Sequence, residues 1–152
     1  MWAFEHSVEC RADRTFAWQF WTNVSNWAIV DSSVESAALD GPFQSGAKGS
    51  TRPRGGEPIH WQLEGVRDLC SAVVMIHVPG AALRCEWKFE DSGVRKTLIT
   101  QRAAIVGDRA SDYVSTAAPE LERGIPLGMW KLAETIEQVA LGSALGRWLC
   151  LF

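Results

Sequence analysis

Hydrophobic residues near the start of the chain predict one strand followed by two short helices. Residues 2 to 10 alternate between apolar and polar side chains, which is typical of a strand with one buried face. After Asp13, a residue suited to capping a helix, the apolar positions follow helical spacing. One side of this helix carries Phe16, Ala17, Phe20, Trp21 and Val24. A second short helix is expected from Trp27 to Val30, after a largely polar break.

Between residues 33 and 106 the apolar residues recur at every second position, which predicts a run of antiparallel strands. Turns are expected where glycine and proline gather, at residues 40–46, 53–57 and 79–80, and at the DSG sequence of residues 91–93. The strands expected between the turns are 34–39, 47–54, 59–64, 72–78, 83–90 and 94–106. The segment 72–78 is apolar on both faces, so it is expected in the middle of the sheet.

After Gly107 the helical period returns and predicts one long amphipathic helix. Its apolar stripe consists of Leu121, Ile125, Met129, Leu132, Ile136, Val139 and Ala140. Gly124 and Pro126 are expected to kink or split it, because proline removes a backbone donor and crowds the preceding turn. A sheet with one apolar face needs a covering layer, and no other predicted element is long enough to supply it.

Composition narrows the class of protein. The chain has 152 residues, the size of one domain, and a net charge of −3, which gives no electrostatic footprint for nucleic acid. No apolar run is long enough to span a bilayer, and the first ten residues alternate like a strand rather than a signal peptide. The four cysteines form no C-x-x-C pair, so we expect buried thiols in a reducing cytoplasm, with no metal and no cofactor.

The order of these elements resembles the START-like, Bet v 1-like (SRPBCC) helix-grip superfamily, which includes a polyketide cyclase/dehydrase and lipid-transport group. The similar segments are ADRTFAWQFWTNVSNW, GPFQSGAKGSTRPRGG, VPGAALRCEWKFED and TLITQRAAIVG, in the family's order. The resemblance implies an α+β fold, a curved antiparallel sheet wrapped around the C-terminal helix with a mostly apolar cavity between them. It covers residues 2 to 141, so we expect one domain over 1–141 and a tail over 142–152.

The residues expected to line this cavity come from the inward faces of the strands and from the long helix. They are Trp27, Trp61, Leu63, Leu83, Trp87, Phe89, Ile99, Gln101, Met129, Leu132 and Ile136. The alternative is that these side chains simply fill the interior. In the last strand, the resemblance to the family implies that Gln101 shares a face with Thr97, Ile99, Ala103 and Ile105. If that face points inward, Gln101 is a neutral polar group among apolar neighbours; the opposite register would bury Arg102, which is unfavourable.

Other candidates have plainer interpretations. Trp21 is expected in the core and Trp18 in a structural contact, whereas Trp27 fits either a core or a ligand contact. His77 fits a rim or hydrogen-bonded position better than a catalytic base. Asp31 and Glu35 lie near the expected cavity mouth, where a carboxylate is usually solvated. The basic residues Lys48, Arg52 and Arg54 are expected in a solvated hairpin.

Three functions remain open. The favoured one is binding of a small hydrophobic molecule, such as a lipid, polyketide or aromatic metabolite, because the inward-facing set contains no titratable group. The alternatives are a cyclase or dehydratase, which would need such a group in the cavity, and a protein-interaction scaffold. A homodimer through residues 141 to 152 is a further hypothesis, since Leu145, Trp148 and Phe152 continue an apolar face opposite the main stripe. Its alternative is that Gly142 and Gly146 end the helix.

Overall fold

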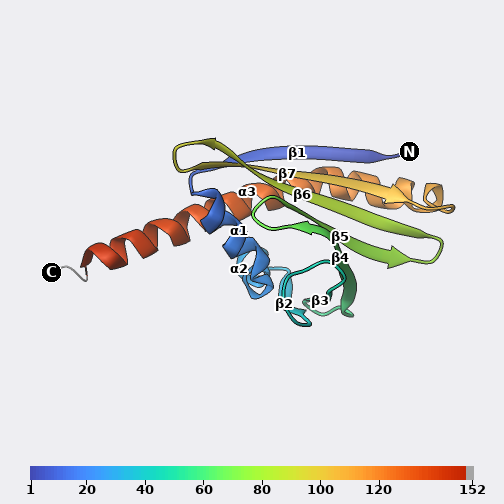
Figure 1. Cartoon of the computed structure of the whole chain (residues 1–152). Helices are drawn as coiled ribbons and strands as arrows, with labels where there is room; N and C mark the ends of the chain where they lie inside the picture. Colours follow the sequence, from blue (N-terminus) through green and yellow to red (C-terminus); the bar gives the residue numbers. More distant parts are fainter. Residues whose placement is uncertain (150–152) are drawn as a thin grey trace.

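One antiparallel sheet forms most of the molecule. The computed structural model describes residues 1–149, with side chains through residue 142. The seven strands lie in the order β1-β7-β6-β5-β4-β3-β2, and each pair is antiparallel (Figure 1). Their bounds are β1 Ala3–Cys10, β2 Val34–Leu39, β3 Lys48–Pro53, β4 Ile59–Arg67, β5 Ser71–Val78, β6 Ala81–Gly93 and β7 Lys96–Val106.

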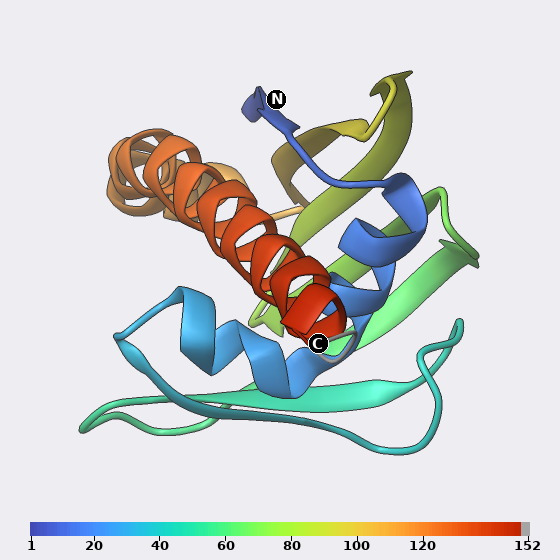
Figure 2. The ribbon, with the colours of Figure 1, turned by 90° about the vertical axis from the view of Figure 1, so that its left-hand side faces the viewer.

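Helices cover the concave face of this sheet. Two of them, α1 (Arg14–Thr22) and α2 (Trp27–Val30), follow β1, with the 3-10 turn η1 (Val24–Asn26) between them. The long helix α3 (Ser111–Leu149) runs along the inside of the curve, and Figure 2 shows the strands bending around it. The predicted α+β fold, with a curved sheet around a long C-terminal helix and two short helices after the first strand, is confirmed.

The long helix is continuous at the position where the sequence predicted a kink or a split. Helix α3 passes through Gly124 and Pro126 without interruption, and it continues beyond Gly142. Stability of a helix in a folded protein comes mainly from packing of its apolar face. Ile125 and Met129 on either side of the proline are buried, so packing holds both halves in line. The alternative in which Gly142 ends the helix is therefore wrong; the expected contacts of Leu145, Trp148 and Phe152 lie outside the described side chains.

The register of β7 decides which residues face the interior. Its odd-numbered residues from Thr97 to Ile105 are all buried, whereas Arg102 is exposed. Gln101 therefore faces inward, directly opposite Trp87 of β6. The predicted register is confirmed. It is the arrangement that keeps the Arg102 guanidinium in water, since burying an unpaired charge is costly.

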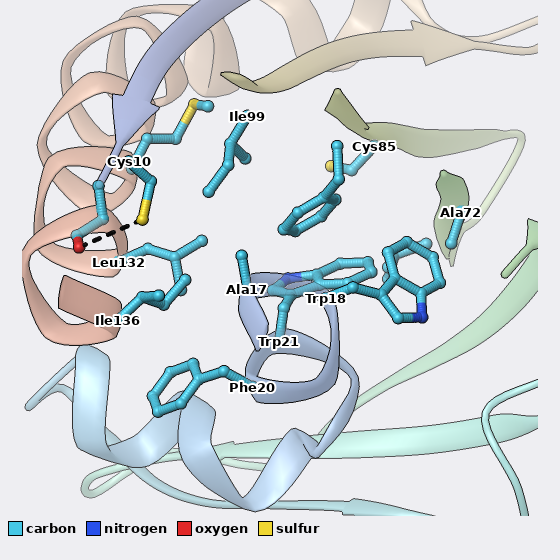
Figure 3. Close-up of a cluster of buried hydrophobic side chains, with 14 of the residues drawn as sticks. Cys10, Ala17, Trp18, Phe20, Trp21, Ala72, Cys85, Ile99, Leu132 and Ile136 are labelled. Carbon is cyan, nitrogen blue, oxygen red and sulfur yellow. Dashed lines mark hydrogen bonds between the residues drawn. The ribbon is translucent and has the colours of Figure 1, made fainter. Parts of the chain in front are cut away.

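The core lies between α3, α1 and the sheet (Figure 3). Cys10, Ile99 and Ile136 are fully buried there, and the Cys10 thiol donates a weak hydrogen bond to the Ala133 carbonyl oxygen at 3.7 Å. Cys10, Cys70 and Cys85 are free thiols; Cys10 and Cys85 are buried as expected, whereas Cys70 is only partly buried. Cys150 lies outside the described residues.

Candidate functional site

A continuous array of aromatic rings runs from the core to one end of the sheet. The Trp21 ring lies 5.7 Å from that of Trp18, 6.1 Å from that of Trp27 and 5.2 Å from that of Trp87, centroid to centroid. Trp27 continues the array to Trp61, at 5.1 Å. These separations lie in the range at which aromatic pairs stabilise each other beyond simple burial.

Hydrogen bonds hold several of these indoles in place. The Trp27 Nε1–H donates to the Trp21 carbonyl oxygen at 2.8 Å. The Trp18 Nε1–H donates to Asp68 Oδ1 at 3.1 Å, and the ring is 3% exposed, so the structural contact predicted for Trp18 is confirmed. Trp61 donates to Thr51 Oγ1 at 3.0 Å. Since each ring also packs against another ring, neither its position nor its tilt is free to change.

A pocket of about 440 Å³ lies beside this array, enclosed by the sheet, the α2–β2 segment and α3, and partly open to solvent. Three tryptophans form one wall: Trp21, Trp27 and Trp87. The sheet and the α2–β2 segment contribute Val30, Asp31, Val34, Thr51, Val74, Cys85 and Gln101. Helix α3 contributes Glu120, Leu121, Gly124, Ile125, Gly128, Met129 and Leu132.

Five of the eleven residues predicted from the sequence line this pocket: Trp27, Trp87, Gln101, Met129 and Leu132. The other six do not, and they pack in the core instead: Trp61, Leu63, Leu83, Phe89, Ile99 and Ile136. Leu83 is partly buried, and the remaining five are at most 4% exposed. These six side chains fill the interior of the protein, which was the alternative to lining a cavity.

Trp61 shows how a side chain can face the interior of the sheet without lining the pocket. A Cβ placed on Gly49 would overlap the Trp61 ring. Gly49 is directly opposite Trp61 in the β3–β4 ladder, and its missing side chain lets the indole lie flat against β3. Trp61 therefore supports Trp27 from behind, and Trp27 presents its ring to the pocket.

Two glycines of α3 line the pocket although the sequence indicated them only as helix breakers or left them unremarked. A Cβ built on Gly124 or Gly128 meets no atom within 4 Å. Both residues are exposed and stand one helical turn apart on the pocket side of α3. Their missing side chains keep this part of the pocket open. A glycine pair at a spacing of four was the available signal.

The buried polar groups of the pocket are Gln101 and Cys85. Gln101 is 9% exposed and Cys85 is 8% exposed. Burial raises the pKa of the Cys85 thiol from its ordinary value of 9.0 to about 11, and a side-chain hydrogen bond with Gln101 opposes this rise. The thiol is therefore protonated at neutral pH.

Carboxylates occur only at the exposed side of the described pocket lining. Asp31 is exposed, and its Oδ1 accepts hydrogen bonds from the backbone N–H and the hydroxyl of Ser33, which is a turn contact. Glu120 is exposed beside Arg123, at 3.9 Å. Glu35 and His77 are exposed and do not line the pocket. His77 occupies the outer face of β5, so the catalytic-base alternative for this residue has no geometric support.

Comparisons with known proteins identify the fold. No protein-family model and no curated protein matches the sequence. Among solved structures, the chain is similar to the Zhui aromatase/cyclase from Streptomyces sp. R1128, with a TM-score of 0.71, 14% sequence identity, and coverage of 90% of this chain and 94% of that one. It is also similar to norcoclaurine synthase from Thalictrum flavum, with a TM-score of 0.70, 14% identity, and coverage of 92% and 86%.

The chain has the helix-grip fold. The expected likeness to START-like, Bet v 1-like proteins is confirmed for the fold alone. The di-domain ARO/CYC BexL matches with a TM-score of 0.75 and 14% identity over 92% of this chain and 48% of its own. Within the described residues, this helix-grip domain has no cluster of side chains suited to a metal ion. None of its described helices is long and apolar enough to cross a membrane.

Proposed function

We propose that this protein binds a small, largely apolar aromatic molecule in the pocket between the sheet and α3. The observation that carries the proposal is the wall formed by Trp21, Trp27 and Trp87, three indoles on one side of a pocket that is otherwise mostly aliphatic. Aromatic rings offer large flat surfaces that favour stacked or edge-on contact with another ring.

Size and shape support this assignment. Ligand pockets range from about 300 to 1,000 Å³, and the volume of 440 Å³ falls within this range. The pocket is bounded by fixed side chains, so little ordering of the protein is needed on binding. The same fold holds small aromatic molecules elsewhere, since norcoclaurine synthase from Thalictrum flavum has been solved in complex with dopamine and hydroxybenzaldehyde.

The chemistry of the wall favours binding over catalysis. A cyclase or dehydratase needs a proton donor or acceptor within hydrogen-bond reach of the reacting atoms. The titratable groups of the described lining are Asp31, Glu120 and Cys85, of which the two carboxylates are exposed and the thiol is protonated. A role as carrier or sensor fits this set of groups better than acid–base chemistry does.

The test uses the full-length protein with N-phenyl-1-naphthylamine, a neutral aromatic probe. We expect saturable binding, a rise in probe fluorescence, and a change in tryptophan emission, since Trp21, Trp27 and Trp87 line the pocket. Native mass spectrometry of freshly purified protein would show any retained small molecule. Failure of the probe to bind, together with a mass equal to that of the bare chain, would rule out the proposal.

Two further proposals accompany this function. We propose a cytoplasmic location, supported by the free thiols of Cys10 and Cys85. The homodimer through residues 141 to 152 also stays a prediction. Leu141 is 62% exposed on α3 and supports it. Sedimentation of the full-length chain beside a chain that ends at Leu141 distinguishes a dimer from a monomer.

A further inference from the structure

The Gln101 amide is a buried polar group within an apolar wall. It lies in the middle of β7, between the fully buried Ile99 and Ala103 on the same face. Moving an amide out of water is unfavourable unless its hydrogen bonds are replaced. A leucine or methionine of similar length would fill this position without that penalty. The amide therefore needs hydrogen-bond partners.

The protein supplies only part of those partners. A glutamine side chain has two N–H donors and a carbonyl oxygen with two lone pairs. Within the described residues the neighbouring group that acts on this amide is the Cys85 thiol, and a thiol is a weak hydrogen-bonding group. Because Gln101 lines the pocket, its remaining capacity is directed to the molecule that occupies this space.

The β6–β7 register places this amide next to the aromatic wall. Gln101 is directly opposite Trp87, and residues so paired have Cβ atoms about 4.5–5.5 Å apart. A planar molecule packed on the Trp87 ring therefore has its edge within reach of the amide. One ligand can make both contacts at once.

The pocket has no group that would neutralise an anion. Its described lining contains no lysine, arginine or histidine. The charged groups of the lining are the carboxylates of Asp31 and Glu120, and Arg123 lies 3.9 Å from Glu120 in an exposed pair. An anionic ligand would lose its hydration without gaining a cation, which is strongly unfavourable.

We infer that the pocket selects planar aromatic molecules with a neutral hydrogen-bonding group, such as a phenol or an aryl ketone, and that Gln101 binds this group. This inference rests on the proposed function. It names the ligand class that the site takes, and it excludes aromatic carboxylates of the same size.

The test compares three probes of one shape: naphthalene, 2-naphthol and 2-naphthoate, each displacing N-phenyl-1-naphthylamine at pH 7. In the unmodified protein, we expect 2-naphthol to bind about three- to tenfold more tightly than naphthalene, the gain typical of one net hydrogen bond. We expect 2-naphthoate to bind more weakly than both. In Gln101→Leu the advantage of 2-naphthol should disappear, while naphthalene binds within about twofold of its original affinity.

Gln19→Leu is the matched control, since Gln19 is exposed on α1 and does not line the pocket. Gln101→Met is the second variant if the leucine protein does not fold. Equal affinity for naphthalene and 2-naphthol in the unmodified protein, or a preference that survives in both Gln101 variants, would overturn the role of Gln101. Tight binding of 2-naphthoate would overturn the exclusion of anions. If N-phenyl-1-naphthylamine and all three naphthalenes fail to bind, the proposed function itself is wrong.

Discussion

Filling the pocket from α3 gives the sharpest test of where the ligand binds. Gly128 lines the pocket, and a Cβ at this position meets no atom within 4 Å. In a helix, a leucine side chain leans toward the preceding turn, which here contains Gly124 and is also vacant. Gly128→Leu therefore adds four carbon atoms to the lining of the pocket, at a position where the Cβ meets open space.

The expected effects on stability and on binding have opposite directions. Leucine is favoured over glycine in a helix interior by about 0.8–1 kcal/mol, so the free energy of unfolding should rise. For a domain of this size, such a gain raises Tm by roughly 2–4 °C. Affinity for N-phenyl-1-naphthylamine should fall by about 5- to 150-fold, because forcing a ligand into occupied space costs about 1–3 kcal/mol.

Gly142→Leu is the matched control. Gly142 lies on the same helix, its Cβ also meets open space, and it does not line the pocket. This variant should gain stability and keep its affinity for the probe. Thermal melting and probe titration of both variants are sufficient measurements. An unchanged affinity in Gly128→Leu, with Tm raised as expected, would show that the ligand binds elsewhere.

Three further outcomes follow from the structure. Trp87→Ala should weaken probe binding yet keep a cooperative melting transition, since truncating a half-buried ring costs less than the roughly 3–5 kcal/mol typical of a close-packed one. The control Trp130→Ala, on the exposed face of α3, should change neither probe binding nor melting. If the Trp87→Ala protein loses its cooperative melting transition, Trp87 is not a pocket residue. Gly49→Ala should destabilise the protein by about 1–3 kcal/mol, measured by urea unfolding, because its Cβ would overlap the Trp61 ring; an unchanged unfolding midpoint would refute this contact. Burial raises the pKa of the Cys85 thiol from 9.0 to about 11, so the stability linked to the protonated thiol is complete below pH 9 and is lost as pH rises toward 11. At pH 8 iodoacetamide should therefore alkylate Cys85 about 100-fold more slowly in the folded than in the urea-unfolded protein, measured by peptide mass spectrometry, and equal rates would show that the thiol is not buried.

Periodicity was sufficient to predict the order and type of the elements, whereas the way they pack together came from the resemblance to a known superfamily. The register of β7 also came from that resemblance. It agreed with a physical contrast, since one register buries a neutral amide at position 101 and the other buries the guanidinium of Arg102. The end of the β6–β7 hairpin was less predictable. Strand β6 continues to Gly93, and the turn centres on Arg95, whose φ of 54° is unusual for a side chain with a Cβ.

The pocket was harder to predict than the fold, because pocket and core use the same residue types. Phe89 and Trp87 both face inward on β6, yet Phe89 is 1% exposed and Trp87 borders open space. Whether a ring is closely packed or borders open space depends on the side chains that face it from the opposite side of the interior. Gly124 and Gly128 were likewise not predicted as pocket residues. Their spacing of four was a signal, but a glycine in a helical pattern first indicates a lower helix propensity.

The tryptophans and the two glycines together explain why the pocket stays open. An apolar gap in a protein normally shrinks as neighbouring side chains relax into it. Here the Trp27 indole donates a hydrogen bond to the Trp21 carbonyl oxygen at 2.8 Å and packs between the Trp21 and Trp61 rings, which oppose its movement into the pocket. Across the pocket, Gly124 and Gly128 have no side chains with which to fill the gap. The tryptophan wall therefore faces a stretch of α3 that has no side chain to insert at Gly124 and Gly128, and the space between them is available for a ligand.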